Sequence, residues 1–281
     1  MKQNREQFES RRKFLKRAIF GVLGIGAATL GYTFLEAKWC RVVRETIRIP
    51  HLPKAFRGFK VALLSDIHHG PFVPLFYVRH VVDMTNELEP DTVMLCGDYV
   101  HRSSEYIEPC IGALGGLKSR HGSFAVLGNH DHWEDATRTR KELRKNNIED
   151  LTNRGVWLAR GDSRIRVCGV GDYWEDTQDL NAALGDAGVD DSTILMSHNP
   201  DYVDEITDKR VGLVLSGHTH GGQVVFPFVG APLIPSRYGD KYLRGLVRTK
   251  STQIYVTRGV GTITPPVRFR CRPEVVLITL T

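Results

Sequence analysis

Cysteine is scarce in this chain: there are five in 281 residues, widely spaced and with no Cys-x-x-Cys pair. Such an odd, scattered set predicts neither a disulfide framework nor a thiolate zinc site. Low-complexity stretches and internal repeats are also lacking, while 41% of the residues are hydrophobic and 25% are charged. These proportions are typical of a globular protein and exclude a disordered, coiled-coil or collagen-like chain.

Outside the N-terminal end, the chain lacks a marked excess of either positive or negative charge. Residues 1–17 contain seven Lys or Arg and two Glu, so their net charge is +5. The whole chain has a net charge of +6, which leaves about +1 for the other 264 residues. A nearly neutral body argues against nucleic acid as a partner.

The basic end is followed by residues 18–35, an uncharged apolar run at the short end of what spans a bilayer as a helix. We expect a transmembrane anchor or an uncleaved signal helix. Basic residues before the run predict a cytoplasmic tip (1–17) and a body that faces outward from a bacterial inner membrane. The alternatives are a buried N-terminal helix and a body peripheral to the cytoplasmic side.

Within the basic tip, the sequence SRRKFLK at residues 10–16 resembles the bacterial twin-arginine export signal. That route carries proteins that have already folded. It therefore suits a protein that binds metal before export.

The body, residues 41–281, shows no break in composition and is predicted to be one domain. Apolar runs typical of buried strands alternate with segments of helical periodicity, which favours an α/β fold, with a second sheet from the strand-rich later half. The predicted strands are 61–64, 92–96, 123–127, 165–170, 193–196, 212–215, 253–257 and 275–279. The predicted helices are 74–88, 105–117, 135–146 and 200–207.

Side chains that can bind metal follow five of the predicted strands. Ligand sites in α/β sheets gather beyond the carboxyl ends of strands, so these side chains are expected to meet in one crevice. The members of the Asp-x-His and His-x-His pairs are two apart, and on an extended segment they would point to the same side. The candidates are Asp66, His68 and His69; Asp98; Asn129, His130 and Asp131; His198; and His218 and His220.

Imidazole, carboxylate and amide ligands together suit Mn²⁺, Fe, Zn²⁺ or Ni²⁺, of which Mn²⁺ is expected. The set is too large for one tetrahedral ion but right for two ions that share a bridge. Asp98 is the candidate bridge, since a carboxylate bridges most easily. Two ions about 3.5–4 Å apart would hold a hydroxide and clamp both oxygens of a phosphoryl displacement. His130 follows Asn129 directly, so its ring is expected beside the phosphoryl group as general acid.

These blocks, in this order, resemble the signature of the calcineurin-like metallophosphoesterases, and the resemblance runs from about residue 59 to the C-terminus. The last of these blocks, in the form GHTHGGQ at residues 217–223, is similar to that of a membrane-associated bacterial branch of the family, as are the segments 258–261, 265–268 and 273–274. The resemblance implies a four-layer α/β/β/α sandwich, here preceded by one N-terminal hydrophobic helix. It also implies one ion held by Asp66, His68, Asp98 and His220, and another by Asp98, Asn129, His198 and His218, with His130 as the acid.

One position departs from the family pattern. Many phosphoprotein phosphatases of the family have an Asp three residues after the bridging carboxylate, where it orients the catalytic histidine. Here that residue is His101. Asp131 is therefore the catalytic candidate for orienting His130, the alternative being that no carboxylate does so.

Three further residues are candidate substrate contacts. His69 follows the first block directly, whereas Arg258 and Arg268 lie in Gly- and Pro-rich turns where a guanidinium could bind phosphate. The alternative for both arginines is that they tie loops together. Aromatic residues such as Phe226 and Phe228 could form an apolar rim for a lipid or aryl group, or simply pack loops.

Together these features predict a hydrolase that cleaves a phosphodiester or pyrophosphate bond with a hydroxide bridging two divalent ions. Membrane tethering predicts a lipid-linked or cell-envelope phosphate ester as substrate. The family resemblance supplies one named candidate, the pyrophosphate of UDP-2,3-diacylglucosamine in lipid A biosynthesis, although a UDP-sugar is cytoplasmic. The alternatives are a phosphomonoesterase and a non-catalytic metal-binding envelope protein. The sequence does not predict the oligomeric state.

Overall fold

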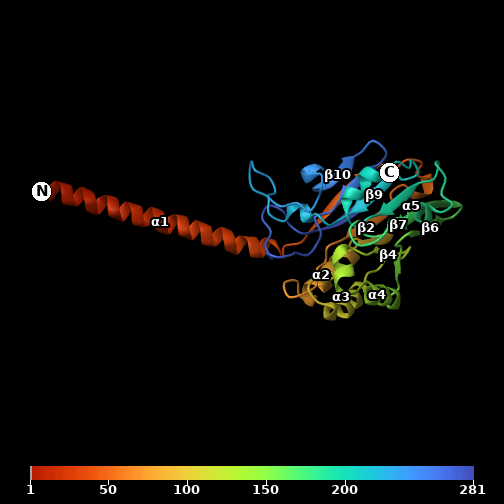
Figure 1. Ribbon diagram of the computed structural model, residues 1–281, viewed down its shortest axis with the longest axis horizontal. Helices are drawn as coiled ribbons and strands as arrows, with labels where there is room; N and C mark the ends of the chain where they lie inside the picture. The colour runs from red at the N-terminus through yellow and green to blue at the C-terminus, as the bar shows by residue number, and fades with distance from the viewer. Residues whose placement is uncertain (1) are drawn as a thin grey trace.

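The computed structural model describes the backbone of residues 2–281 and the side chains from residue 13 onward. Helix α1 (Lys2–Glu36) leaves the rest of the molecule as a long rod, and the other elements form one body (Figure 1). The Arg11–Arg12 pair of the twin-arginine-like segment lies outside the described side chains, so its role stays a prediction.

Two six-stranded sheets form the centre of the body within residues 2–281. The first has the order β1-β12-β2-β3-β4-β5, and the second has the order β10-β11-β9-β8-β7-β6. The strands of the first sheet are β1 (Arg41–Ile47), β2 (Lys60–Leu64), β3 (Thr92–Cys96), β4 (Ser123–Val126), β5 (Ile148–Asp150) and β12 (Glu274–Leu280). Those of the second are β6 (Arg154–Arg160), β7 (Ser163–Gly169), β8 (Thr193–Met196), β9 (Leu213–Ser216), β10 (Gly245–Arg248) and β11 (Gln253–Val256).

Helices cover the outer face of each sheet. One buried apolar cluster joins the first sheet to α2 (Leu75–Asn86), α3 (Ile107–Leu114) and α4 (Asn129–Lys145). A second fills the space between the sheets, and a third joins the second sheet to α5 (Leu180–Leu184) and the 3₁₀ segment η3 (Pro200–Glu205). The predicted α/β/β/α sandwich is therefore confirmed. The shorter 3₁₀ segments are η1 (Lys54–Phe56), η2 (Ser104–Tyr106), η4 (His220–Gly222) and η5 (Gly239–Tyr242).

The predicted core strands lie within a few residues of the observed ones, because each is a short apolar run buried on both faces. The strands missed by the prediction, β1, β5, β6 and β10, are the four edges of the two sheets. Edge strands are partly exposed, so their sequences mix polar and apolar residues and give a weak signal.

Two helix predictions need correction. The segment 200–207 forms the 3₁₀ segment η3 instead of an α-helix. Helix α4 begins at Asn129, earlier than predicted, and is interrupted at Asp135, whose φ of −175° and ψ of 91° are not helical. The predicted start of this helix therefore coincides with the interruption, and the first part of α4 carries the third block of candidate site residues.

Helix α1 contains a stretch, Lys13–Glu36, that is long and apolar enough to cross a membrane by length and composition. Its apolar side chains are exposed, so the alternative of a buried N-terminal helix is wrong. The end of α1 is fixed to the body. The buried Glu36 carboxylate accepts backbone N–H groups from Cys271 at 2.6 Å and Arg270 at 3.1 Å, and the Arg268 N–H donates to the Thr33 carbonyl at 3.0 Å.

Candidate metal centre and active site

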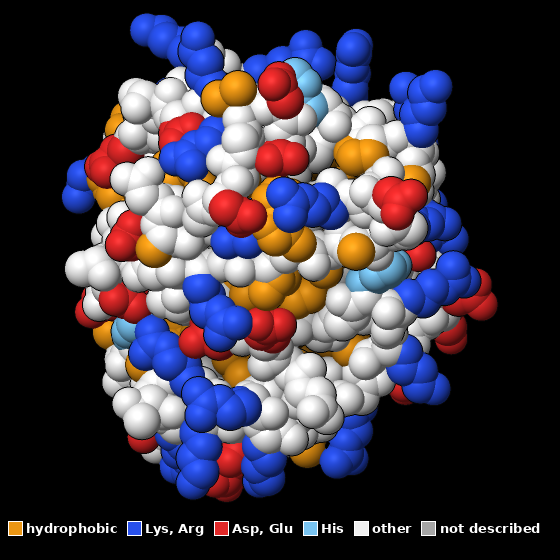
Figure 2. Space-filling model, turned by 90° about the vertical axis from the view of Figure 1, so that its right-hand side faces the viewer, with side chains coloured by type: hydrophobic (Ala, Val, Ile, Leu, Met, Phe, Trp, Pro, Cys, Tyr) orange, Lys and Arg blue, Asp and Glu red, His pale blue; other side chains and the backbone are white. Residues whose placement is uncertain are grey.

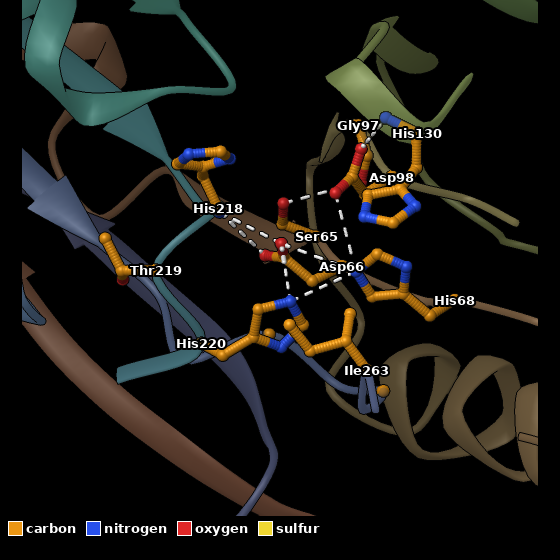
Figure 3. A network of polar contacts seen from close by, with 12 residues as sticks. Ser65, Asp66, His68, Gly97, Asp98, His130, His218, Thr219, His220 and Ile263 are labelled. Atoms are coloured by element: carbon orange, nitrogen blue, oxygen red, sulfur yellow. Dashed lines mark hydrogen bonds and ion pairs between the residues drawn. The ribbon is translucent and has the colours of Figure 1, made fainter. Parts of the chain in front are cut away.

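Loops that follow five core strands meet at one edge of the two sheets. Strands β2, β3 and β4 are parallel neighbours, as are β7, β8 and β9, so the loops after them leave in common directions. Figure 3 shows Asp66, His68, Asp98 and His220 directing their side chains toward one another. All seven predicted ligands are buried there: Asp66 and His68 after β2, Asp98 after β3, Asn129 after β4, His198 after β8, and His218 and His220 after β9.

Asp98 lies at the centre of this arrangement. Its Oδ2 atom is 3.4 Å from His68 Nε2 and 3.3 Å from His198 Nε2. Its Oδ1 atom accepts the backbone N–H of His130 at 2.9 Å, which fixes the orientation of the carboxylate. One oxygen therefore faces imidazole nitrogens that come from different sheets.

The side chains divide into two clusters around Asp98. In the first, His68 Nε2 is 3.1 Å from His220 Nε2, and His220 Nε2 is 3.5 Å from Asp66 Oδ1. In the second, His218 Nδ1 is 3.0 Å from Asn129 Oδ1 and 3.3 Å from His198 Nε2. Each cluster gathers atoms that can bind a metal ion.

The mixed donor set and its charge fit two divalent cations. Among the described side chains, no Lys or Arg forms an ion pair with Asp66 or Asp98, whose ion-pair partners are histidines. Burying a carboxylate without compensating charge is costly. Two cations held by these nitrogen and oxygen atoms would supply that charge, and Asp98 Oδ2 lies where both could share it.

Burial keeps most of these imidazoles neutral. It lowers the pKa of His68 and of His220 well below the ordinary value, and that of His218 to about 3. A neutral ring nitrogen is the form that binds a cation. Burial also disfavours the charges of Asp98 and His198, but their mutual attraction outweighs it, so the pKa of Asp98 is lowered and that of His198 is raised.

The backbone of the ligand loops differs from the prediction of extended segments. Five of the seven ligand residues have positive φ: Asp66 (54°), His68 (48°), Asp98 (57°), His218 (71°) and His220 (52°). A non-glycine residue in this region costs roughly 1–2 kcal/mol, and such residues gather at functional sites. Tight left-handed turns, not alternation along a strand, therefore turn these side chains inward.

Glycines let the loops approach each other closely. A Cβ atom added at Gly217 would collide with the Asp66 carboxylate, and one added at Gly97 would collide with the backbone of Gly128. Gly97 also has a φ of 85°, which a side chain rarely adopts. The glycines beside the ligands therefore permit the close packing of loops from which the site is built.

Comparison with known proteins identifies the family. The family model of the calcineurin-like phosphoesterases matches residues 59–222. The chain belongs to the calcineurin-like phosphoesterase family. The uncharacterized metallophosphoesterase YkuE of Bacillus subtilis is 35% identical over 96% of this chain and 97% of that protein. The phosphodiesterase YaeI of Escherichia coli is 30% identical over 96% and 99%, respectively.

Membership of the calcineurin-like phosphoesterases confirms the resemblance drawn from the sequence blocks. The chain is thus a metal-dependent phosphoester hydrolase, and its residue clusters match the dinuclear site that this family uses. A transmembrane protein with a metallophosphoesterase domain from Danio rerio is 32% identical over 85% of this chain and 57% of that protein. With the apolar stretch of α1, this likeness suggests association with a membrane.

His130, the predicted acid, is half-buried beside the first cluster. The centre of its ring is 4.7 Å from that of His68 and 4.5 Å from that of Trp133. Its Nδ1 atom lies 3.3 Å from Nδ1 of His101. The residue at the position of the phosphatase Asp therefore does contact His130, although with an imidazole in place of a carboxylate.

Asp131 occupies a different position from the catalytic one that was predicted. Its Oδ2 accepts backbone N–H groups from Asp98 at 2.8 Å and Gly128 at 2.9 Å, and its Oδ1 accepts that of Tyr99 at 2.9 Å. The carboxylate is fully buried, and the structure gives it no hydrogen bond to the His130 ring within the described residues. Asp131 joins the loop after β3 to the start of α4, and so positions Asp98.

The surroundings of Arg268 favour the structural alternative over the predicted substrate contact. Its side chain is completely buried, and its guanidinium donates to backbone carbonyls at short range: Gly261 and Arg258 at 2.7 Å and Cys271 at 3.0 Å. A weaker bond reaches the carbonyl of His220 at 3.4 Å. Arg268 therefore ties the C-terminal loops to one candidate ligand, which was the structural alternative.

Arg258 and His69 also have partners within the protein. Arg258 Nη1 lies 3.5 Å from Glu274 Oε2, and its backbone N–H donates to the same carboxylate. His69 Nδ1 lies 2.8 Å from the Val73 carbonyl, and its buried ring packs edge-on against Tyr106. A substrate contact by either residue stays a prediction, and the observed contacts favour the structural alternative for Arg258.

Some contributors to the site were missed by sequence reasoning. His198 Nδ1 lies 2.6 Å from the Cys96 carbonyl, which orients the ring with Nε2 toward Asp98. A backbone carbonyl leaves no signal in a sequence. Ile263, which is drawn with the site residues in Figure 3, donates its backbone N–H to Oε1 of Gln223 at 3.1 Å, and nothing in the Ile-Thr-Pro-Pro sequence around it indicates this contact.

Proposed function

We propose that this phosphoester hydrolase cleaves a phosphodiester or pyrophosphate bond in a lipid-linked or cell-envelope substrate, with two divalent ions as cofactors. The observation that carries the proposal is the place of Asp98 Oδ2 between His68 and His198. We assign the first ion to Asp66, His68, Asp98 and His220, and the second to Asp98, Asn129, His198 and His218. Mn²⁺ is the proposed metal.

The proposed chemistry divides between the ions and His130. When bound, two such ions activate water for attack and stabilise charge on the phosphoryl oxygens. The Nδ1 atom of His130 faces His101, which leaves Nε2 to carry the proton that is given to the departing oxygen. Asp131 supports this step only through the backbone of the Asp98 loop.

The arginines support a diester over a monoester. A phosphate monoester is more highly charged than a diester and benefits from guanidinium donors. Arg268 is buried with its donors on carbonyl groups, and Arg258 is paired with Glu274. Neither is placed as a free phosphate donor.

The proposed location follows from α1. We propose that residues 18–35 anchor the chain in a bacterial inner membrane, with the basic tip (1–17) in the cytoplasm and the catalytic domain (41–281) facing outward. An outward domain would meet envelope phosphodiesters. A domain on the cytoplasmic side would meet UDP-2,3-diacylglucosamine. A reporter fused to the C-terminus, read for activity inside or outside the cell, separates these two substrates.

The reaction is tested with the full chain in detergent, loaded with Mn²⁺ and given an aryl phosphodiester or the matching monoester. We expect turnover of the diester, and a loss of about 10²–10⁴-fold in His130→Ala with metal content unchanged. His121→Ala is the matched control, because this ring packs on Phe59 away from the site. Faster turnover of the monoester would favour a phosphomonoesterase. Full metal content without turnover of either, or of UDP-2,3-diacylglucosamine, would favour a metal-binding envelope protein.

A further inference from the structure

An apolar loop projects from the body directly after the last candidate ligands. Residues 223–236 contain no charged side chain, yet several of them face solvent. Phe228 is fully exposed, and Leu233 and Val229 are 80% and 77% exposed. Exposed apolar side chains are normally scattered singly, so a group of large ones on one loop indicates an interaction surface.

This loop has a defined shape. The Phe226 N–H donates to the Gly230 carbonyl at 2.9 Å, and the Gly230 N–H donates back to Phe226 at 3.0 Å. The Val225 N–H donates to the Phe269 carbonyl at 2.9 Å. Backbone bonds therefore hold Phe228 at the tip of a closed turn, with a positive φ of 66°. The fold presents this apolar tip to the outside.

The loop lies beside the end of α1. The ring of Phe226 is 6.2 Å from that of Phe269, which is in turn 6.4 Å from the ring of Tyr32 in α1. Figure 1 shows the loop on the side of the body from which α1 projects. If α1 spans a bilayer, this tip lies at the surface where the helix emerges.

The residues beside the end of α1 are of the types found at a membrane surface. Trp39 is 56% exposed, and the guanidinium of Arg272 lies 3.9 Å from the centre of its ring. Lys38 and Arg270, which are also exposed, add positive charge. Tryptophan and basic residues are typical of the headgroup level of a membrane, and basic side chains are attracted to anionic lipids.

We propose that the loop 224–234 inserts Phe228, Val229 and Leu233 into the bilayer as a second membrane contact beside α1. The inference rests on the proposed anchoring by α1 and not on the proposed reaction. A single helix leaves a domain free to tilt, whereas two contacts fix its orientation. The base of the loop is tied to the site, since the Gln223 N–H donates to the carbonyl of the candidate ligand His220 at 3.1 Å. Insertion would thus hold the metal centre near the lipid headgroups.

The test measures membrane depth at single sites of the full chain. A nitroxide is attached to Cys at position 228 (Phe228→Cys) in vesicles of phosphatidylethanolamine and phosphatidylglycerol, with Cys40→Ser removing the one partly exposed native thiol. Val22→Cys, in the middle of α1, reports whether the helix is inserted. Val189→Cys is the matched control in water, because Val189 is exposed and closely follows α5, which lies on the far side of the body from α1 (Figure 1). Collision rates with oxygen, which enters lipid, and with a nickel chelate, which stays in water, give the depth.

We expect oxygen collisions to exceed nickel collisions at positions 22 and 228, and the reverse at 189. If position 228 lies in water while position 22 lies in lipid, the inference of a second membrane contact is overturned, but the proposed anchoring by α1 stands. Both positions in water would overturn the anchoring as well, and neither result bears on hydrolysis. Spectral broadening at 228 that disappears on dilution with unlabelled chain would mean that the tip packs against a second copy, which also overturns the inference.

Discussion

The candidate ligands at the centre of the site differ from the buried polar side chains around them in what their atoms contact. Asp98 directs one oxygen at two imidazoles. Asp131 contacts the backbone of Asp98, and both of its carboxylate oxygens accept hydrogen bonds from backbone N–H groups. Arg268 likewise donates to backbone carbonyls. Burial and charge alone therefore do not identify a candidate metal ligand. Contact with other ligand side chains does, even in Asp66, whose carboxylate also accepts the backbone N–H of His218.

The largest effect is expected at the centre. Asp98→Asn removes the charge that the two clusters share, and an amide cannot bridge two cations as a carboxylate does. We expect turnover to fall by at least about a thousandfold, because metal ions supply several kcal/mol of transition-state stabilisation. Elemental analysis after dialysis should show less metal than in the unmodified chain.

A matched control for this change is Asp190→Asn, whose side chain is 91% exposed. It should leave both turnover and metal content unchanged. Full metal content in Asp98→Asn, with normal thermal stabilisation by added Mn²⁺, would show that Asp98 is not a shared ligand. The division into two clusters around it would then have to be abandoned.

An intermediate effect is expected at the support of Asp98. Asp131→Asn replaces an acceptor oxygen by an NH₂ group that cannot accept the buried N–H groups. We expect a loss of about 1–3 kcal/mol in the free energy of unfolding, measured by urea denaturation. Turnover should fall by about 10–100-fold, as for other residues that position metal ligands.

Asp135→Asn is the control, since this carboxylate also accepts a backbone N–H in α4, that of Arg138, but is only partly buried. Asp135→Asn should lower the free energy of unfolding less than Asp131→Asn does, and this variant should keep normal turnover. If Asp131→Asn instead loses turnover at unchanged stability and metal content, Asp131 acts on His130 directly, as the sequence had suggested.

Sequence reasoning predicted the centre of the site well because of where its residues stand. Asp66, Asp98 and His198 each follow an apolar run that is easily read as a buried strand, and the carboxyl ends of parallel strands converge. The chemistry of the set then requires cations. Which residues gather could thus be predicted without coordinates.

The partners of each side chain could not be predicted in the same way. Asp131 and Asn129 belong to one block, and only the course of the backbone after Gly128 decides which faces the centre. The left-handed turns at Asp66 and Asp98 are set by contacts between loops, which leave no local periodicity. Edge strands and the junction of α1 with Cys271 depend equally on residues distant in sequence.

The smallest effect on turnover is expected at Arg268, where sequence and structure disagree most. Arg268→Lys keeps the charge but leaves buried carbonyls, such as that of Gly261, without their donor. We expect a loss of about 1–3 kcal/mol in the free energy of unfolding. The KM for a phosphodiester should stay unchanged, because the guanidinium is fully buried and its donors are on backbone carbonyls. Arg270→Lys, on the exposed neighbour, is the control and should change neither quantity. A raised KM at normal stability would show that Arg268 contacts the phosphate of the substrate. Arg268 would then belong with the candidate ligands and not with the buried polar side chains around them.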